Sequence, residues 1–422
     1  MKPSLKLSGL KSMDESIRVL LIPSSDYLGH PFPQRYNHIF ERLHGKNLEI
    51  HVLRFRLSDE VKIPTHVMVH ELEFEVPCKN ATKYYALNSV SHNIEVLRLI
   101  RNEGIDIVVV SNLSPALILP LLKLFRAINI PIIFDLQDYY PSGAAGYVSS
   151  QGSILYSIAE EVALQITKTL IRYSDIVTAP SRTLLRLAKR LGAKRAFFIP
   201  NGIPEYFTKL YKDQALQLRK EFGLYDSIIL GFVGSIEFWL RMDTVVEALY
   251  KLVDKGLDVK FVIIGGGLQT SYAVKLWNQI KELDLKSHVV KLGFIPHRLL
   301  PSYVAMFDIG LIPFDENSRL TLFVEEPLKL LEYLSQEVIV FATPLKGLLL
   351  HTRQYCAFYR NAEELAKLIM EFIDRREYYI TRAKMGRQFV IQNRTWNKIA
   401  KLFHKCILEA LAIRRKRGII ST

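Results

Sequence analysis

Short apolar runs alternate with longer amphipathic segments along almost the whole chain, and this alternation is its strongest structural constraint. Residues 105–111 form a nearly unbroken apolar run, which is typical of a parallel strand covered on both faces. The segment before it, residues 84–101, carries apolar side chains at helical spacing instead. Strand and helix patterns in regular alternation predict an α/β fold, with a doubly wound parallel sheet between helices.

The alternation runs through the chain twice. Its first pass ends with a strand at 195–199, and residues 200–204 then place a turn-forming Asn-Gly pair between two prolines, as is common at a domain boundary. A second pass begins at 228–234, where a strand runs into a glycine turn. A length of 422 residues fits two or three domains. We predict an N-terminal domain at 1–203, a C-terminal domain at 204–394, and a final helix with a basic tail at 395–422.

Composition and cysteine usage favour a globular protein of a reducing compartment. Hydrophobic residues make up 49% of the chain and charged residues 23%, which is enough for a sizeable core. The three cysteines, Cys78, Cys356 and Cys406, fit neither a metal spacing nor a disulfide framework. Residues 1–16 lack the apolar core of a signal peptide, and polar residues and prolines interrupt the most apolar region, 105–133. We therefore expect a cytoplasmic protein.

The charge balance favours an anionic partner. The formal net charge is +14, so nucleic acid, anionic lipid and phosphorylated substrates are all compatible. Four basic residues at 414–417 follow an apolar helical segment near the C-terminus. They indicate either peripheral binding at the inner face of a membrane, or a solvated tail that interacts favourably with the end of a helix.

The stretch 325–334 is the best candidate for binding a phosphorylated ligand. It reads as a helix that follows a polar loop, and Pro327 occupies a position where a first-turn proline is tolerated. Free backbone N–H groups and a partial positive charge make such a helix end suitable for a phosphate. Lys329 and Glu332 lie three residues apart, so they share roughly one face. Lys329 supplies a cation and Glu332 an acceptor for sugar hydroxyls.

Three further loops follow predicted strands of the second half, at the edge where ligands of such sheets bind. The first contains Gly234 and Ser235, and glycine allows a phosphate to approach the backbone closely. The second contains Gly265 and Gly266, and the third contains Phe294, Ile295 and Pro296. A cation near the first loop is expected from Arg241 or Lys329. An ordinary surface role is the alternative for Arg241, and a solvated Lys/Glu pair on an amphipathic helix is the alternative for Lys329 and Glu332.

The four loops in this order resemble the group-1, GT4-like glycosyltransferases of the GT-B fold, in the branch whose donor helix reads Pro-x-Lys-x-x-Glu-Tyr. The resemblance implies two Rossmann-like domains that face each other across a cleft, with a last helix that crosses back to the first domain. It also implies that Glu332, the second of two glutamates flanking seven residues, holds the ribose of a nucleotide sugar, and that residues 294–296 seat the base. Val324 occupies the first glutamate's position, and Glu325, one residue later, is the candidate substitute.

The resemblance extends to the first half. Residues 135–141 are similar to the Asp-x-His-Asp-x-x-Pro element of related transferases, with Gln137 at the histidine position. Asp138 then contacts sugar hydroxyls or acts as a base, with Glu325 and Lys329 as further catalytic candidates; a simple turn aspartate is the alternative. Gly29 and His30 follow the first strand, in the loop that touches the acceptor in this fold. A solvated loop histidine is the alternative for His30.

The predicted function is therefore transfer of a sugar from a nucleotide-diphosphate donor to an acceptor, with retention of configuration by resemblance. The basic surface favours a lipid-linked sugar or glycan as acceptor. No Asp-x-Asp element or metal-spaced His/Cys cluster occurs, so we expect no metal and no cofactor besides the nucleotide-sugar. Two alternatives stay open: a nucleotide-sugar epimerase on the same fold, and a basic protein that binds polyanions or membrane surfaces. Aromatic and basic residues do not interleave, so we expect no nucleic acid partner.

Overall fold

The computed structural model describes residues 16–78, 81–112, 118–125, 127–149, 152–267 and 270–420. Within these ranges, positions 81, 82, 85, 86, 147 and 415–420 are described by their backbone alone. The side chains of the basic residues 415–417 therefore lie outside the described part of the chain.

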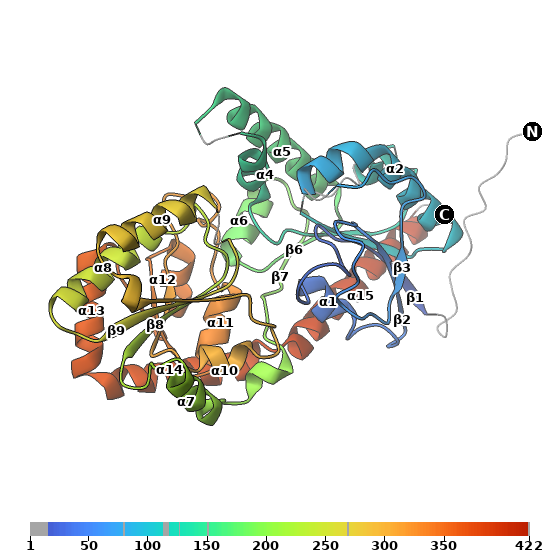
Figure 1. Cartoon of the computed structure of the whole chain (residues 1–422). Coiled ribbons are helices and arrows are strands. Elements are labelled where there is room, and N and C mark those ends of the chain that lie inside the picture. Colours follow the sequence, from blue (N-terminus) through green and yellow to red (C-terminus); the bar gives the residue numbers. More distant parts are fainter. Residues whose placement is uncertain are drawn as a thin grey trace, which may run out of the picture. The chain divides into compact units, whose positions relative to one another are not determined.

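The first half of the chain builds a seven-stranded sheet in the order β3-β2-β1-β4-β5-β6-β7 (Figure 1). β1 pairs in parallel with β2 and β4, and the pairs β2–β3 and β6–β7 are parallel as well. All five residues of the apolar run in β4 are buried, which confirms the prediction of a strand covered on both faces. The strands are β1 (Ile17–Ile22), β2 (Leu48–Leu53), β3 (Met68–His70), β4 (Ile107–Ser111), β5 (Ile132–Asp135), β6 (Ile176–Ala179) and β7 (Ala196–Phe198).

Helices connect these strands as the alternation predicts. Ser181 accepts a hydrogen bond from the Leu184 N–H and so caps α6, as expected for a serine before a helix. One helix, α4, was not predicted, and its first turn contains Pro141. The helices are α1 (Arg35–Phe40), α2 (Ala81–Asn102), α3 (Ile118–Leu124), α4 (Tyr140–Val148), α5 (Ile154–Tyr173) and α6 (Arg182–Arg190).

The second half builds a six-stranded sheet in the order β10-β9-β8-β11-β12-β13, and all of its pairings are parallel. The direction of the strand order reverses between β8 and β11, and ligands of open α/β sheets bind at the carboxyl ends of the strands beside such a reversal. The strands are β8 (Ile228–Val233), β9 (Val259–Ile264), β10 (Val289–Gly293), β11 (Ile309–Ile312), β12 (Ile339–Ala342) and β13 (Cys356–Phe358).

Helices cover both faces of this sheet. α8 packs against α9 and α13, whereas α11 packs against α14 and α10, and Figure 1 shows these two groups on opposite sides of the strands. The short helices are η1 (Glu205–Thr208) and η2 (Lys286–His288). The others are α7 (Lys212–Glu221), α8 (Met242–Asp254), α9 (Ser271–Glu282), α10 (Leu300–Val304), α11 (Leu328–Ser335), α12 (Lys346–Thr352), α13 (Ala362–Asp374), α14 (Arg376–Asn393) and α15 (Trp396–Ile420).

Two parallel sheets with helices between their strands confirm the predicted α/β class. The chain divides into two compact units, and the divisions fall after Phe134, Arg172, Asp175 and Phe403. The last division falls inside α15, so the end of this helix belongs to the unit that holds β1 to β4. In that unit Arg414 lies 3.5 Å from a carboxylate oxygen of Asp106. The domain limits given above, at 203/204 and 394/395, stay predictions.

Candidate functional site

The site is built around the N-terminal end of α11. Leu330, Leu331 and Leu334 are buried, and this apolar side fixes the helix against its neighbours. The helix begins at Leu328, so Pro327 is its N-cap residue and not a member of the first turn, one position earlier than predicted. The side chain of Pro327 forms no capping hydrogen bond with this end. Its first backbone N–H groups therefore remain suitable for an anionic ligand.

Lys329 lies in the first turn of α11 and is surrounded by aromatic rings. Its Nζ is 4.4 Å from the ring centre of Phe232 and 5.1 Å from that of Phe314. Burial lowers the pKa of Lys329 to about 8, and the negative charge of Glu332 offsets part of this effect. Among the described residues no carboxylate forms an ion pair with Nζ. A lysine in this state gains from an incoming phosphate, because the anion supplies the missing charge partner.

Glu332 lies one turn further along α11 and is almost fully buried. Its Oε1 is 3.0 Å from Nε2 of His297, whose Nδ1 is 2.5 Å from the hydroxyl of Tyr206. Neither His297 nor Tyr206 was predicted from the sequence as a site residue. The one available signal was the position of His297, which directly follows the predicted base-binding residues 294–296.

The predicted glycine turns meet beside this helix. A Cβ at Gly234 would lie 3.2 Å from Nζ of Lys329, and a Cβ at Gly265 would lie 2.3 Å from the carbonyl oxygen of Gly234. Gly234 and Gly265 both have φ +136, which side-chain-bearing residues rarely adopt. The next residue, Gly266, accepts a hydrogen bond from the Ile236 N–H. The turns after β8 and β9 therefore present exposed backbone to the same place that Lys329 reaches.

Replacing Gly265 with alanine is expected to lower the free energy of unfolding by more than about 2 kcal/mol, because the methyl group would collide with the Gly234 carbonyl and strain the backbone. The matched control is Gly256→Ala. Gly256 also has positive φ, +79, but a Cβ there meets nothing within 4 Å. The control should lose only about 1 kcal/mol. Equal losses in urea unfolding of the two variants would contradict the close approach of the two turns.

The other predicted donor residues lie around the same turns. Ser235 is exposed directly after Gly234, and the loop of Phe294, Ile295 and Pro296 follows β10. The Gly293 carbonyl accepts the N–H of Gly265, so this loop starts beside the second glycine turn. Phe294 is 55% exposed and leaves an aromatic face for a ligand.

Arg241 forms its hydrogen bond elsewhere, with the backbone of Arg360. It precedes α8, and its guanidinium donates to the carbonyl of Arg360 at 2.9 Å. Of the two cations considered for the first glycine loop, Lys329 is the one beside Gly234. A role of Arg241 in donor binding stays a prediction.

Glu325 is 1% exposed and contacts the start of α6. Its Oε1 accepts the N–H of Thr183 at 2.8 Å, its Oε2 is 3.5 Å from Arg182, and its Oε1 is 3.9 Å from Nε2 of His351. A carboxylate at a helix N-terminus is stabilised by the helix dipole. Its Oε2 accepts no hydrogen bond from the described residues. The predicted catalytic role of Glu325 stays a prediction, and the structure shows its carboxylate engaged with α6.

Asp138 is exposed in the loop between β5 and α4, and its carbonyl accepts the N–H of Tyr140. The earlier aspartate of the motif, Asp135, is buried and accepts hydrogen bonds from Thr178 at 2.6 Å and Gln137 at 3.2 Å. Asp135 is therefore held in a buried position by its neighbours, whereas Asp138 occupies an exposed position.

The same region holds an ion pair that the sequence did not reveal. Glu160 of α5 accepts from Arg319 at 2.7 Å and from the hydroxyl of Ser142 at 2.5 Å. Arg319 belongs to the polar loop that precedes α11. Tyr139 and Phe323 also lie together, with ring centres 5.0 Å apart. The loop that carries Asp138 is thus in contact with the loop that leads to α11.

Gly29 and His30 lie in the loop after β1. Gly29 is buried, and its N–H donates to Asp26, whose carboxylate also pairs with Arg54 at 3.0 Å. Arg54 and the backbone N–H groups at this loop hold the pKa of Asp26 below its usual value, although burial acts in the opposite direction. Burial lowers the pKa of His30, and its Nδ1 lies 2.9 Å from the Phe32 carbonyl oxygen. The loop is therefore well ordered by its own contacts.

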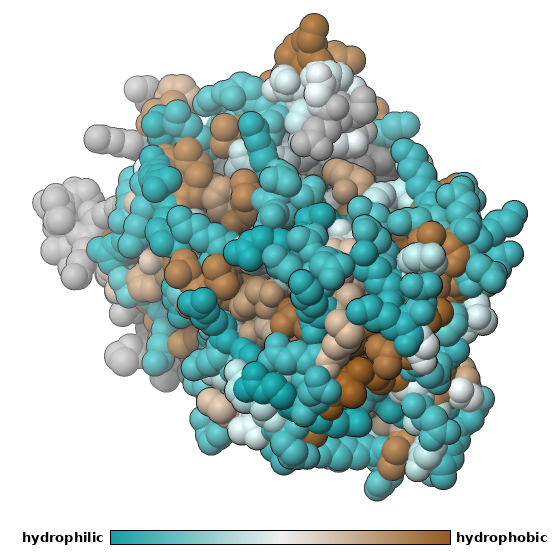
Figure 2. All heavy atoms as spheres, turned by 90° about the vertical axis from the view of Figure 1, so that its left-hand side faces the viewer, coloured by the Kyte–Doolittle hydropathy of each residue, from teal (hydrophilic) through white to brown (hydrophobic). Residues whose placement is uncertain are grey.

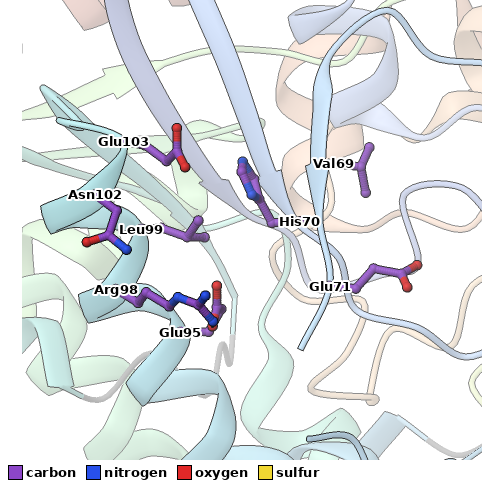
Figure 3. A pocket seen from close by; sticks show the side chains of 8 residues that line it. All are labelled: Val69, His70, Glu71, Glu95, Arg98, Leu99, Asn102 and Glu103. Carbon is purple, nitrogen blue, oxygen red and sulfur yellow. The ribbon is translucent and has the colours of Figure 1, made fainter. Parts of the chain in front are cut away.

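A hollow of about 350 Å³ lies between β3 and α2 (Figure 3). Glu71, Glu95 and Glu103 contribute carboxylates to it, against the single guanidinium of Arg98 and the imidazole of His70. This excess of negative charge disfavours binding of a diphosphate in the hollow. Among the described residues no group of His, Cys, Asp and Glu side chains has a metal-binding arrangement.

Solved structures share this architecture. HepE of Anabaena, solved in complex with UDP, superposes with a TM-score of 0.69 at 15% identity, covering 93% of this chain and 100% of that one. Sucrose-phosphate synthase of Thermosynechococcus elongatus gives a TM-score of 0.71 at 15% identity, covering 94% and 100%. At these identities the likeness concerns the fold alone, and it confirms the predicted GT-B class.

Curated relatives match part of the chain. A 2-deoxystreptamine glucosyltransferase of Streptomyces kanamyceticus is 28% identical over 148 residues, which are 34% of this chain and 38% of the relative. An alpha-D-kanosaminyltransferase of the same organism is 23% identical over 193 residues, 44% of this chain and 48% of the relative. The matches thus span less than half of these relatives' length.

Two family models match consecutive parts of the chain. The model described as Glycosyltransferase Family 4 matches residues 36–205, and the one described as Glycosyl transferases group 1 matches residues 215–391. The predicted Pro-x-Lys-x-x-Glu-Tyr branch stays a prediction. Since the two models cover most of the sequence in the order that the two sheets follow, the chain belongs to the group 1 glycosyltransferases.

Proposed function

We propose that the protein transfers a sugar from a nucleoside-diphosphate donor to an acceptor hydroxyl. The observation that carries this proposal is the convergence of Lys329, Glu332 and the turns at Gly234 and Gly265 around the first turns of α11. Binding of a nucleotide-sugar requires three elements: a cation, an acceptor for hydroxyl groups, and backbone that no side chain covers.

The donor's parts each have a partner in this arrangement. The diphosphate approaches Gly234 and Gly265 and gains the charge of Lys329 and the N–H groups at the start of α11. The ribose hydroxyls donate to Glu332, and the base lies against Phe294, Ile295 and Pro296. Solved complexes of HepE with UDP and with UDP-glucose, on the same fold, support a nucleotide ligand of this kind.

The leaving nucleoside diphosphate gains negative charge as the glycosidic bond breaks. We assign its stabilisation to Lys329 and the helix N–H groups, without a metal ion, because these groups are preorganised where the charge develops. Retention of configuration is proposed from membership of the family. Asp138 is proposed to contact sugar hydroxyls or to act as a general base, and Gly29 and His30 are proposed to contact the acceptor.

A lipid-linked acceptor is the proposed substrate class. Helix α5 exposes four large apolar side chains on one side, and a hydrophobic cluster lies at the top of Figure 2, where Figure 1 places α4 and α5. The net charge of +14 adds attraction to an anionic surface. Among the described residues, no helix is both long and apolar enough to span a bilayer. The four exposed residues are Ile154, Leu155, Ile158 and Val162.

The test is a panel of UDP-, GDP- and ADP-sugars, incubated with the protein in EDTA, with and without membrane lipid extract as acceptor. Release of nucleoside diphosphate and movement of labelled sugar into lipid are the expected results. Absence of binding to every donor would reject the proposal. Conversion of the donor sugar into its epimer without an acceptor would favour the epimerase alternative, and activity that needs added Mg²⁺ or Mn²⁺ would reject the metal-free mechanism.

A further inference from the structure

The imidazole of His297 joins two side chains that are far apart in the sequence. Its Nε2 is 3.0 Å from Oε1 of Glu332, and its Nδ1 is 2.5 Å from the hydroxyl of Tyr206. An ionised carboxylate only accepts hydrogen bonds, so Nε2 carries a proton and donates a hydrogen bond to Glu332. In the neutral imidazole Nδ1 is then an acceptor, and the Tyr206 hydroxyl donates to it. The three groups form a directed chain that ends on the carboxylate.

The chain is protected from water. The side chains of His297 and Glu332 are only 14% and 7% exposed. The rings of Tyr206 and Phe207 flank the imidazole, with centres 5.7 and 5.5 Å from its own. A hydrogen bond in such a setting constrains a carboxylate more strongly than the same bond at the surface, because water does not compete for the acceptor.

Tyr206 is itself fixed in position. It belongs to η1, and the backbone of η1 is tied to the far end of α11, where Gln336 donates to the carbonyls of Phe207 at 3.0 Å and Lys209 at 2.9 Å. Arg387 of α14 donates to the Thr208 carbonyl at 2.7 Å. Both ends of the hydrogen-bond chain, Tyr206 and Glu332, are thus held by one rigid part of the structure.

Among the described residues, hydrogen bonds reach only one carboxylate oxygen of Glu332. Oε1 accepts a hydrogen bond from the imidazole N–H of His297, whereas Oε2 accepts none. We propose that His297, oriented by Tyr206, is a positioning residue that fixes Glu332 with Oε2 available to the donor ribose. This inference rests on the proposed function, since it assigns a supporting role within the same nucleotide site.

The experiment compares nucleotides with and without ribose hydroxyls. Isothermal titration calorimetry measures Kd for UDP, GDP and ADP and for their 2′,3′-dideoxy forms, with wild type, His297→Ala, His297→Gln and Glu332→Ala. His297→Ala should weaken binding of the ribonucleotide about tenfold, the loss expected for one hydrogen bond to a charged group, and leave the dideoxy form within about twofold. In His297→Gln an amide N–H lies near the former Nε2, so this variant should restore most of the affinity for the ribonucleotide.

Two further variants complete the test. His288→Ala is the matched control, because His288 lies in η2 before β10 and its Nδ1 contacts the Val259 carbonyl instead. Tyr206→Phe removes a single hydroxyl group. It tests the positioning role of His297 if the His297→Ala variant does not fold. A smaller ratio between the Kd values of the dideoxy form and the ribonucleotide in Tyr206→Phe supports the inference. An unchanged ratio in this variant overturns it.

The outcomes separate this inference from the proposed function. If wild type binds none of the nucleotides, the proposed function fails and the positioning role fails with it. A second outcome is that wild type binds ribonucleotides more tightly than their dideoxy forms and Glu332→Ala loses this preference. If His297→Ala then keeps the preference of wild type, the donor site stands and the role of His297 is overturned.

Discussion

Replacing Glu332 with alanine is expected to lower kcat/KM for the nucleotide-sugar by about 100-fold or more. The buried carboxylate receives hydrogen bonds from ribose hydroxyls in the proposed complex, and each bond to a charged group contributes about 1.5–3 kcal/mol. Glu332→Gln keeps the shape but loses the charge, so its loss should be smaller, about tenfold. Initial rates at varied donor concentration measure both effects.

The control for this prediction is Glu282→Ala, which removes an exposed carboxylate at the end of α9. Its activity should equal that of wild type. Retention of full activity in Glu332→Ala, with the thermal midpoint of wild type, would contradict the assignment of α11 as the donor helix.

Replacing Lys329 with methionine is expected to abolish measurable transfer and, at the same time, to stabilise the unliganded protein at pH 7. The lysine lies near the rings of Phe232 and Phe314 and forms no ion pair with a carboxylate in the described part of the chain, and burial lowers its pKa from 10.5 to about 8. That lowering corresponds to about 3 kcal/mol, of which we expect about 2 kcal/mol to be recovered by an apolar side chain of similar length. Gain of stability with loss of function is the signature of a charge kept for a ligand.

The pH dependence gives this prediction a second readout. Between pH 8 and 10.5 the unfolded chain keeps the Lys329 proton while the folded protein loses it, so the contribution of this residue to stability rises with pH. The stability advantage of Lys329→Met should therefore be fully present below pH 8 and shrink as the pH approaches 10.5. Urea unfolding at several pH values measures it. Lys367→Met, at a side chain that is 68% exposed, should show no such trend. A destabilised Lys329→Met protein at pH 7 would contradict the argument.

Local sequence patterns were sufficient to predict the framework of the proposed donor site. The alternation of apolar runs and amphipathic segments predicted parallel strands and covering helices, because burial on one face or two imposes a spacing on the sequence. Glycines after strands and a Lys/Glu pair on one helix face were visible for the same reason. The structure brings Gly234, Gly265 and Lys329 together because parallel strands end at a common edge.

Some side-chain contacts could not be predicted because the two partners are far apart in the sequence. Glu325 is close to α11 in the sequence, yet its carboxylate contacts Thr183, which is 142 positions away. The side chain of Arg241 is directed to the Arg360 carbonyl and not to the glycine turn beside it. No periodicity encodes such contacts, since each depends on where two separate chain segments pack.

The sequence by itself determined the alternation of strands and helices, the α/β class with parallel sheets and the residues placed at the carboxyl ends of the strands, because these follow from hydrophobic spacing and turn chemistry within short windows. Only the tertiary structure decided which side chains form hydrogen bonds with one another. Tyr206, His297 and Glu332 come from three separate segments, and their hydrogen bonds exist only once η1, the loop after β10 and α11 are packed together. A hydrogen bond requires approach within about 3 Å, and that precision comes from packing and not from local sequence.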